Sequence, residues 1–225
     1  MLTKRSVLFG TYDTADYGWT LTGCQLTAPE QKTNYVEKSG GDGSWDLSTV
    51  LSDGTPRYKD RTLTVDLVCS EGTRQEREDI LNHMVNLLDG FEWQIILPDQ
   101  PNYYLTGRVH IAVNVSDWAH ASVTITALCA PWFFRTAETV VTVGDTTGVF
   151  GGNVTLRNSG RRAIVPRITI VGEESVSLKY GTSATNLSAG SYEWPTLLLT
   201  PGNHEVTCSG YKTTVTFTYR EAVLR

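Results

Sequence analysis

The chain reads RTLTVDLVC at positions 61–69 and, after three further residues, TRQEREDILNHMVNLL at positions 73–88. The first segment alternates polar and apolar residues with a period of two, which is typical of a strand with one buried face. The second segment carries apolar residues at helical spacing, namely Ile80, Leu81, Met84, Val85 and Leu88. It is therefore predicted to form an amphipathic helix that lies as a lid on one face of a sheet.

Both ends of this helix are marked by local chemistry. Thr73 followed by Glu76 three residues later fits a capping box, in which each side chain satisfies a free backbone N–H group of the other residue. Gly90 lies just beyond the last apolar residue, where a left-handed turn commonly ends a helix. The helix is accordingly predicted to span about residues 73–88.

The segments around the helix predict strands. Residues 20–27, 104–115 and 121–129 are rich in Thr, Val, Ile and Leu, the composition of half-buried strands. In the last segment, four apolar residues share one face: Val123, Ile125, Ala127 and Cys129. Leu128 falls on the opposite face among threonines, which predicts partial covering of the sheet on both sides.

The second half of the chain shows short strand-like segments separated by turns and no competing helical period. They are 138–143, 152–156, 164–171, 175–180, 194–199, 203–208 and 213–219. Seven or more strands at this spacing are typical of a β-sandwich or jelly roll. We therefore predict a mainly-β protein: an N-terminal β-sandwich-like domain with one helix (residues 1–135) and a C-terminal β-sandwich (residues 136–225).

Composition restricts the classes of function. The net charge is −5, and residues 1–135 hold 11 Lys and Arg against 17 Asp and Glu. The only basic cluster is the pair Arg161 and Arg162, so specific nucleic-acid binding is not expected. The N-terminus has no apolar signal region, and no run approaches the roughly 20 apolar residues of a membrane span. We expect a protein that is made in the cytoplasm and does not insert into membranes.

The reactive side chains form no recognisable catalytic or metal-binding pattern. Four cysteines lie far apart without a Cys-x-x-Cys pair, and no histidine stands at zinc-ligand spacing, so buried free thiols are expected. The four histidines have no Ser or Cys beside them in a known nucleophile pattern. No enzyme activity, cofactor or metal is therefore predicted.

Three large aromatic residues lie in a turn-rich segment between positions 13 and 60. Tyr35, Trp45 and Tyr58 stand there among turn-forming pairs of Gly, Asp and Pro, which indicates long loops or hairpin arms. Aromatic residues on an arm could anchor a neighbouring subunit, because they bury much area at little entropic cost. They could equally fold back under their own arm.

A second group of aromatic residues lies in the predicted C-terminal sandwich. It consists of Tyr180, Tyr192, Trp194 and Tyr211. Exposed rings on such a sheet could stack on sugars, whereas rings in the core would only pack between the sheets. Tyr192 and Trp194 are the predicted sugar-stacking pair.

Several segments in a fixed order resemble the distal tail protein (Dit) family of long-tailed phages. The helix is followed by Asp89-Gly90, a strand at 92–97 and PDQPNYYLTGR at 98–108, of which Tyr103-Tyr104 to Gly107-Arg108 is the most telling part. An alternating strand then ends in Cys129-Ala-Pro-Trp132. In the second half the resemblance rests on LRNSG (156–160), PRITI (166–170), LTPG (199–202) and FTYRE (217–221).

This resemblance implies a structural protein of the virion, at the distal end of the tail tube. The first domain would build a hexameric ring, and a galectin-like second domain would face outward. Its expected partners are further copies of itself, the tail tube protein, the tape-measure protein and the tail-tip or receptor-binding proteins. The alternative is a carbohydrate-binding module of a tail-associated host-recognition protein, carried by Tyr192 and Trp194.

Overall fold

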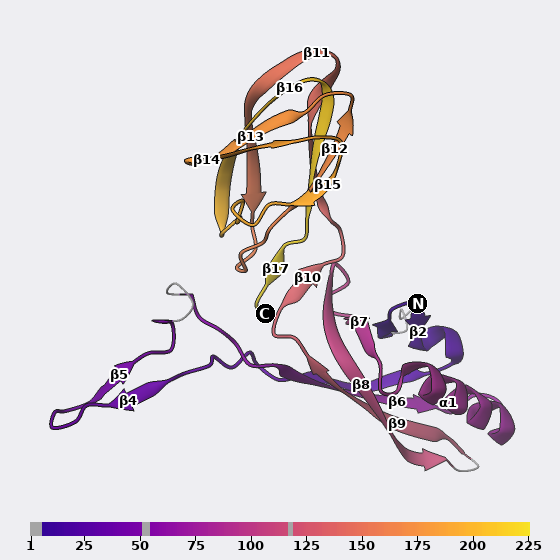
Figure 1. Cartoon of the computed structure of the whole chain (residues 1–225). Coiled ribbons are helices and arrows are strands. Elements are labelled where there is room, and N and C mark those ends of the chain that lie inside the picture. The colour runs from indigo at the N-terminus through magenta and orange to yellow at the C-terminus, as the bar shows by residue number, and fades with distance from the viewer. Residues whose placement is uncertain (1–5, 51–54, 117–118) are drawn as a thin grey trace. The chain divides into compact units, whose positions relative to one another are not determined.

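A computed structural model describes residues 6–50, 55–116 and 119–225 of the chain. The chain divides into two compact units (Figure 1). The first unit comprises the residues up to Phe133 together with Leu224–Arg225, and the second comprises Phe134–Val223. Strands predominate in both units, so the prediction of a mainly-β fold is confirmed.

The first unit is built on one antiparallel sheet with the strand order β2-β1-β7-β8-β9-β6-β3. Its strands are β1 (Leu8–Phe9), β2 (Tyr12–Asp13), β3 (Thr20–Leu26), β6 (Arg61–Cys69), β7 (Glu92–Ile96), β8 (Tyr103–Ser116) and β9 (Ala121–Cys129). A 3-10 helix, η1 (Thr14–Tyr17), follows β2, and the α-helix α1 (Arg74–Leu88) follows β6. Two short strands at the boundary of the units, β10 (Phe133–Arg135) and β17 (Ala222–Val223), pair with each other.

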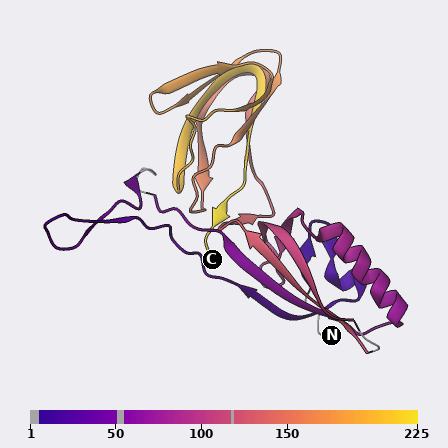
Figure 2. The same ribbon diagram turned by 60° about the horizontal axis from the view of Figure 1, so that its bottom comes forward.

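The helix covers one face of this sheet, as its apolar stripe predicts (Figure 2). Leu81, Met84 and Leu88 are buried on the side of α1 that contacts β8 and β9. Beneath them the alternate residues of β9 are buried, and these include the four predicted from the pattern: Val123, Ile125, Ala127 and Cys129. The apolar face of the strand, predicted from its period of two, and the apolar face of the helix, predicted from its period of 3.6, therefore pack in one core.

The opposite face of the sheet is open, which differs from the expected covering of both faces. The side chain of Leu128 is 60% exposed there. Its neighbours in the register are Thr62 of β6 and Arg108 of β8, both exposed. Polar residues of this kind need no apolar cover, so a single Leu among them is not evidence of a second covering layer.

The capping box predicted for the helix is present. The Thr73 backbone N–H group donates to Glu76 Oε2 at 2.7 Å, and the Glu76 backbone N–H group donates to Thr73 Oγ1 at 3.3 Å. These hydrogen bonds lower the pKa of Glu76, because they favour the ionised carboxylate. The last helical turn is followed by Gly90 with φ of 78°, the left-handed conformation predicted for that position.

The second unit has the strand order β14-β13-β16-β12-β15, with β11 paired to β16. Its strands are β11 (Thr139–Asn158), β12 (Arg167–Gly172), β13 (Val176–Tyr180), β14 (Ser183–Leu187), β15 (Gly190–Glu193) and β16 (Gly202–Tyr219). The pairs of short segments predicted at 138–143 and 152–156, and at 203–208 and 213–219, are each one long strand. Glycines at 144, 151 and 152 suggest an interruption, but the ladder continues past them.

A bend in the long antiparallel pair of β11 and β16 makes the two layers of this unit. Residues 207–209 of β16 pair with β13, whereas residues 213–218 pair with β12. Between these stretches the register of β11 shifts from Asp145 to Val149, and Lys212 of β16 takes φ of 46°. Buried residues of both layers, including Leu156, Val206 and Phe217, form one core. The hydrogen bonding is therefore continuous through a bend, rather than divided between two separate sheets.

The cysteines depart from the expectation that all four are buried. Cys69, Cys129 and Cys208 are buried, whereas Cys24 on β3 is exposed. Burial raises the pKa of Cys129 to about 12 and that of Cys208 to about 11, so both stay protonated and unreactive at neutral pH.

A thiol reagent should distinguish these positions. Partial burial and the nearby Asp99 carboxylate raise the pKa of Cys24, but its exposed sulfur remains open to a reagent. In the native protein we therefore expect Cys24 to react first and the three buried thiols to react readily only in denaturant. Titration with Ellman's reagent followed by peptide mass mapping measures this. More than one rapidly modified cysteine in the native state would contradict the described core.

Candidate subunit interface

Residues 27–60, called the arm below, leave the first sheet between β3 and β6. The arm carries the hairpin of β4 (Tyr35–Glu37) and β5 (Ser44–Asp46), which pair only with each other in the described part of the chain (Figure 1). The segment 51–54, on its return path, lies outside the described residues.

Hydrogen bonds fasten the base of the arm to the sheet. The Thr27 backbone N–H group donates to Thr62 O at 3.0 Å, and Arg61 Nε donates to Thr27 O at 2.7 Å. Further out, Lys59 Nζ lies 2.7 Å from Glu30 Oε1 in an exposed ion pair. The two sides of the arm thus run together from the base, which gives the hairpin a defined exit from the sheet.

Turn chemistry shapes the hairpin itself. The Lys38 backbone N–H group donates to Gly43 O at 3.2 Å, and Gly43 has φ of 77°, which few other residues adopt at low cost. On the far side, Asp46 Oδ1 accepts the Ser48 backbone N–H group at 2.9 Å. Hydrogen bonds from the side chain and backbone of Ser48 lower the pKa of Asp46 and hold the end of β5 in place.

The hairpin has no hydrophobic core of its own. All six residues of β4 and β5 are exposed, with Tyr35 at 62% and Trp45 at 61%. An isolated two-stranded hairpin is at best marginally stable in water, and large exposed apolar groups mark interaction surfaces. Neither ring is folded under the arm in the isolated chain.

The register divides the hairpin into two different faces. Val36 lies opposite Trp45, so the two side chains share a face, and the Lys38 ammonium stands 4.9 Å from the centre of the Trp45 ring on that side. Tyr35 lies opposite Asp46 on the other face. The apolar face of the hairpin is therefore formed by Val36 and Trp45, and the structure does not bring Tyr35 and Trp45 together.

Tyr58 has a different environment from the other two predicted residues. It is half-buried at the base of the arm, bridged to Gln31, and its ring packs edge-on against Trp132 at 5.7 Å. This contact lies within the first unit. An interface role for Tyr35, Trp45 and Tyr58 stays a prediction, with Trp45 the best placed of the three.

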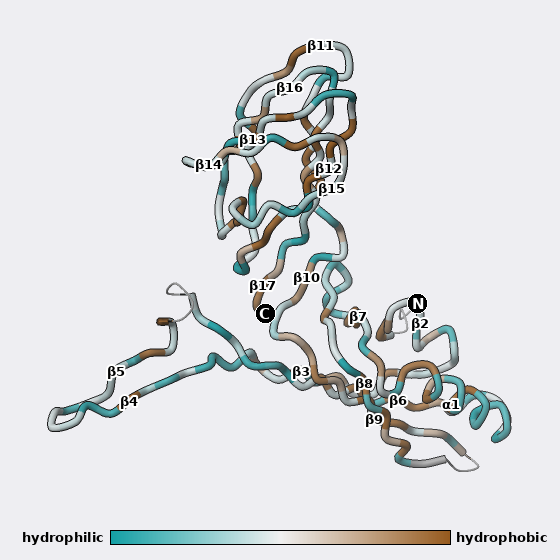
Figure 3. Tube along the Cα trace, in the orientation of Figure 1, coloured by the Kyte–Doolittle hydropathy of each residue, from teal (hydrophilic) through white to brown (hydrophobic). Residues whose placement is uncertain are grey.

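Three exposed aliphatic residues of the arm were not among the interface residues predicted from the sequence, which were all aromatic. Val36, Leu47 and Val50 are 45%, 39% and 64% exposed. Hydrophobic positions accordingly stand out near β5 within the mostly polar arm (Figure 3). Val36 and Trp45 are visible in the sequence as apolar positions, but their pairing across the hairpin requires the register.

Tyr192 and Trp194, the predicted sugar-stacking pair, are half-buried and pack against the core of the second unit. Tyr180 also packs there, and its hydroxyl lies 2.8 Å from His204 Nδ1. Tyr211 is the exposed member of the group of four, at 44%.

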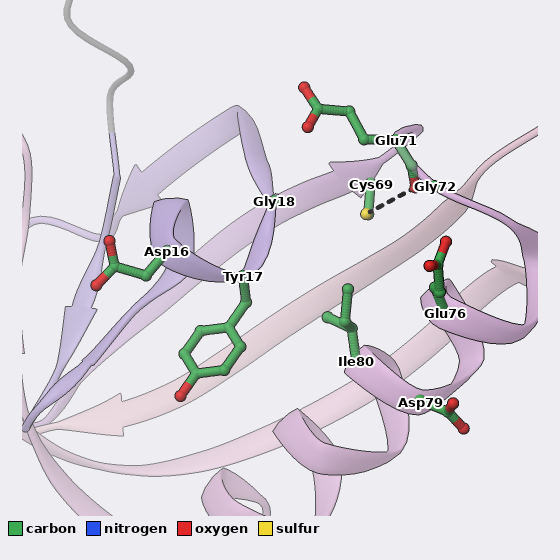
Figure 4. Close-up of a pocket in the computed structure, with 9 residues that line it drawn as sticks. All are labelled: Asp16, Tyr17, Gly18, Cys69, Glu71, Gly72, Glu76, Asp79 and Ile80. Carbon is green, nitrogen blue, oxygen red and sulfur yellow. Dashed lines mark hydrogen bonds between the residues drawn. The ribbon is translucent and has the colours of Figure 1, made fainter.

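A pocket of about 500 Å³ lies between η1, the end of β6 and the start of α1 (Figure 4). It is lined by Asp16, Tyr17, Gly18, Cys69, Glu71, Gly72, Glu76, Asp79 and Ile80. Four of these residues are acidic, yet Glu76 is engaged in the capping box and Asp79 accepts a hydrogen bond from Gln75. No histidine or lysine lines the pocket to act as a base beside the Cys69 thiol. We assign it no catalytic role.

Residues 6–50, 55–116 and 119–225 hold neither a metal-binding cluster nor a membrane-spanning helix. These residues contain no group of three or more His, Cys, Asp and Glu arranged to hold a metal ion. No helix in the same ranges is long and apolar enough to cross a membrane.

Comparison with known proteins identifies the fold. No protein-family model matches the sequence, and no curated protein matches it. The crystal structure of the Dit protein of phage SPP1, described as a paradigm of the hub adsorption apparatus in phages that infect Gram-positive bacteria, superposes with a TM-score of 0.66. The alignment covers 97% of this chain and 99% of that one at 17% identity. A chain of the phage p2 baseplate, in its activated conformation with Sr, gives a TM-score of 0.51 at 11% identity over 96% and 98% of the two chains. The chain therefore has the fold of the SPP1 Dit protein along nearly its whole length, as the resemblance in its sequence predicts.

Proposed function

We propose that this chain is a structural, non-enzymatic hub protein of a phage tail, forming a hexameric ring at the distal end of the tail tube. In this role residues 1–135 build the ring and residues 136–225 form an outward domain. The ring connects the tube and the tape-measure protein to the tail-tip or receptor-binding proteins, and the protein resides in the virion.

The observation that carries the proposal is the extent of the fold match. Both units of the chain are matched together to a protein described as part of a phage hub adsorption apparatus, with only a few per cent of either chain left over. A shared single domain would say little about function, because common folds serve many roles. A match over both units and nearly the full length of both chains restricts the possible functions much more than a match of one domain does.

The arm supports the ring in particular. A head-to-tail ring requires two different surfaces on each subunit, one that reaches out and one that receives. The Val36 and Trp45 face reaches out from the sheet without cover of its own. Its exposed indole and valine side chains suit the centre of a protein interface, where aromatic residues are enriched.

Native mass spectrometry of the purified chain tests this proposal. Six copies of a 24.8 kDa chain give a particle of about 149 kDa, which we expect as the main species at micromolar concentration. Addition of the tail tube protein should shift the ring to a larger complex. A chain that stays at the monomer mass alone and with the tube protein would contradict the hub role.

A further inference from the structure

One outer face of the second unit combines an exposed aromatic ring with a regular array of small polar groups. The face is formed by β14, β13, residues 202–211 of β16 and residues 149–158 of β11, which are paired in that order. Leu178, Val206 and Cys208 point into the core and are fully buried. Because side chains alternate along a strand, the residues between them point outward, and they are exposed.

The register arranges these outward residues in rows across the strands. The rows are Asn186–Ser177–Ser209–Gly151, Ala184–Lys179–Thr207–Asn153 and, at the margin, Tyr211–Val149. The first row consists mostly of small residues. It lies between Tyr211 on one side and the larger side chains of the second row on the other. A strip of small side chains is therefore bordered on both sides by larger ones, and these two rows are called the borders below.

The dimensions of this strip follow from strand geometry. Tyr211 and Thr207 are four residues apart on β16, which corresponds to about 14 Å at about 3.4 Å per residue. A short oligosaccharide, rather than a single hexose ring, can lie on the Ser177–Ser209–Gly151 strip and reach both borders.

The borders supply the two interactions that sugars use. Tyr211 offers an aromatic face, and Lys212, held at φ of 46°, places its ammonium 5.4 Å from the ring centre. On the other side, the Thr207 hydroxyl donates to Asn153 Oδ1 at 2.9 Å. That bond uses the oxygen of the amide and leaves its NH₂ group as a donor for a ligand.

Other classes of ligand fit this face less well. The centre of a protein interface is depleted in polar groups, whereas here the strip is serine and glycine and the apolar residues lie at the margin. A nucleic acid requires a basic stripe, but Lys179 is accompanied by Glu205 on the same face. Hydroxyl-rich ligands with an apolar ring face match the combination that is present.

We propose that this face binds a neutral oligosaccharide, with one hexose unit stacked on Tyr211 and the hydroxyls of a neighbouring unit bonded to Asn153, Thr207 and Lys179. Tyr192 and Trp194 are not part of this site, since both rings pack against the core. Binding does not depend on the hub role, because the site lies within the second unit.

A panel of maltohexaose, cellohexaose, chitohexaose and mannohexaose, titrated into the full-length chain by isothermal calorimetry, tests the proposal. We expect at least one sugar to bind at millimolar concentration or below. Tyr211→Ala should weaken that binding about tenfold, the size of one lost aromatic contact, whereas Tyr211→Phe keeps the ring and the affinity.

Val171→Ser is the matched control, since Val171 is 67% exposed on the other layer of the same unit. It should bind the sugar as the wild type does. Circular dichroism of each variant checks that the fold is intact. Absence of binding across the panel would overturn the proposal, and so would binding that survives Tyr211→Ala or is lost in Val171→Ser.

Discussion

A Val36→Ser/Trp45→Ser double variant is expected to stay folded and to lose ring assembly. Both residues are exposed in the isolated chain and share one face of the arm hairpin, so their replacement removes no core contact. Substitutions at such surface positions usually change folding stability by less than about 0.5 kcal/mol. An aromatic anchor at the centre of an interface contributes about 2 kcal/mol or more, which is a loss of about thirtyfold in each subunit contact.

Sedimentation velocity of the double variant measures this effect, with Val171→Ser as an exposed valine outside the arm. The control should assemble like the wild type. Tyr35→Ser distinguishes the two faces of the hairpin, because Tyr35 lies opposite Asp46, and we expect a smaller effect from it. A double variant that assembles at wild-type concentrations would show that the arm does not hold the ring.

A Gly144→Val variant is expected to unfold the second unit while the first unit stays folded. Gly144 has φ of 142° at the bend of the β11–β16 strand pair, and a Cβ atom there would stand 2.3 Å from Thr213 O and 2.7 Å from Thr214 Cα. Backbone strain of about 2 kcal/mol and overpacking of about 2 kcal/mol together approach the whole stability of a small domain. Without the bend, the two halves of each long strand cannot enclose the shared core.

Hydrogen exchange read by mass spectrometry resolves the two units in the same sample. Peptides of β12, β13 and β16 should lose protection in Gly144→Val, and peptides of β6 and β9 should keep it. Gly152→Ala is the control on the same strand, because a Cβ atom there meets nothing within 4 Å. Retained protection in the second unit of Gly144→Val would mean that the bend tolerates a side chain.

The first unit could be predicted closely because its signals are local. Helical spacing, the Thr73–Glu76 capping box and the Gly90 turn each depend on residues a few positions apart, and all three are present. The buried face of β9 followed from strict alternation in the same way. Leu128 shows the limit of that reasoning, since a single apolar residue does not reveal whether a second layer exists.

The second unit could not be predicted in the same detail because long-range pairing overrides local turn signals. Gly151 and Gly152 favour a break, but their pairing with Ser209 and Cys208 carries β11 through as one strand. The exposure of the arm could not be predicted either, because the sequence around Trp45 is the same whether its ring is covered or exposed. Only the register shows that Val36 and Trp45 share a face and that Tyr35 does not.

Negative-stain electron microscopy of the purified full-length chain tests the central claim most directly. The account predicts ring-shaped particles whose class averages show six-fold symmetry, and their loss in the Val36→Ser/Trp45→Ser variant. Monomer-sized particles at the highest soluble concentration, unchanged when the tail tube protein is added, would contradict it.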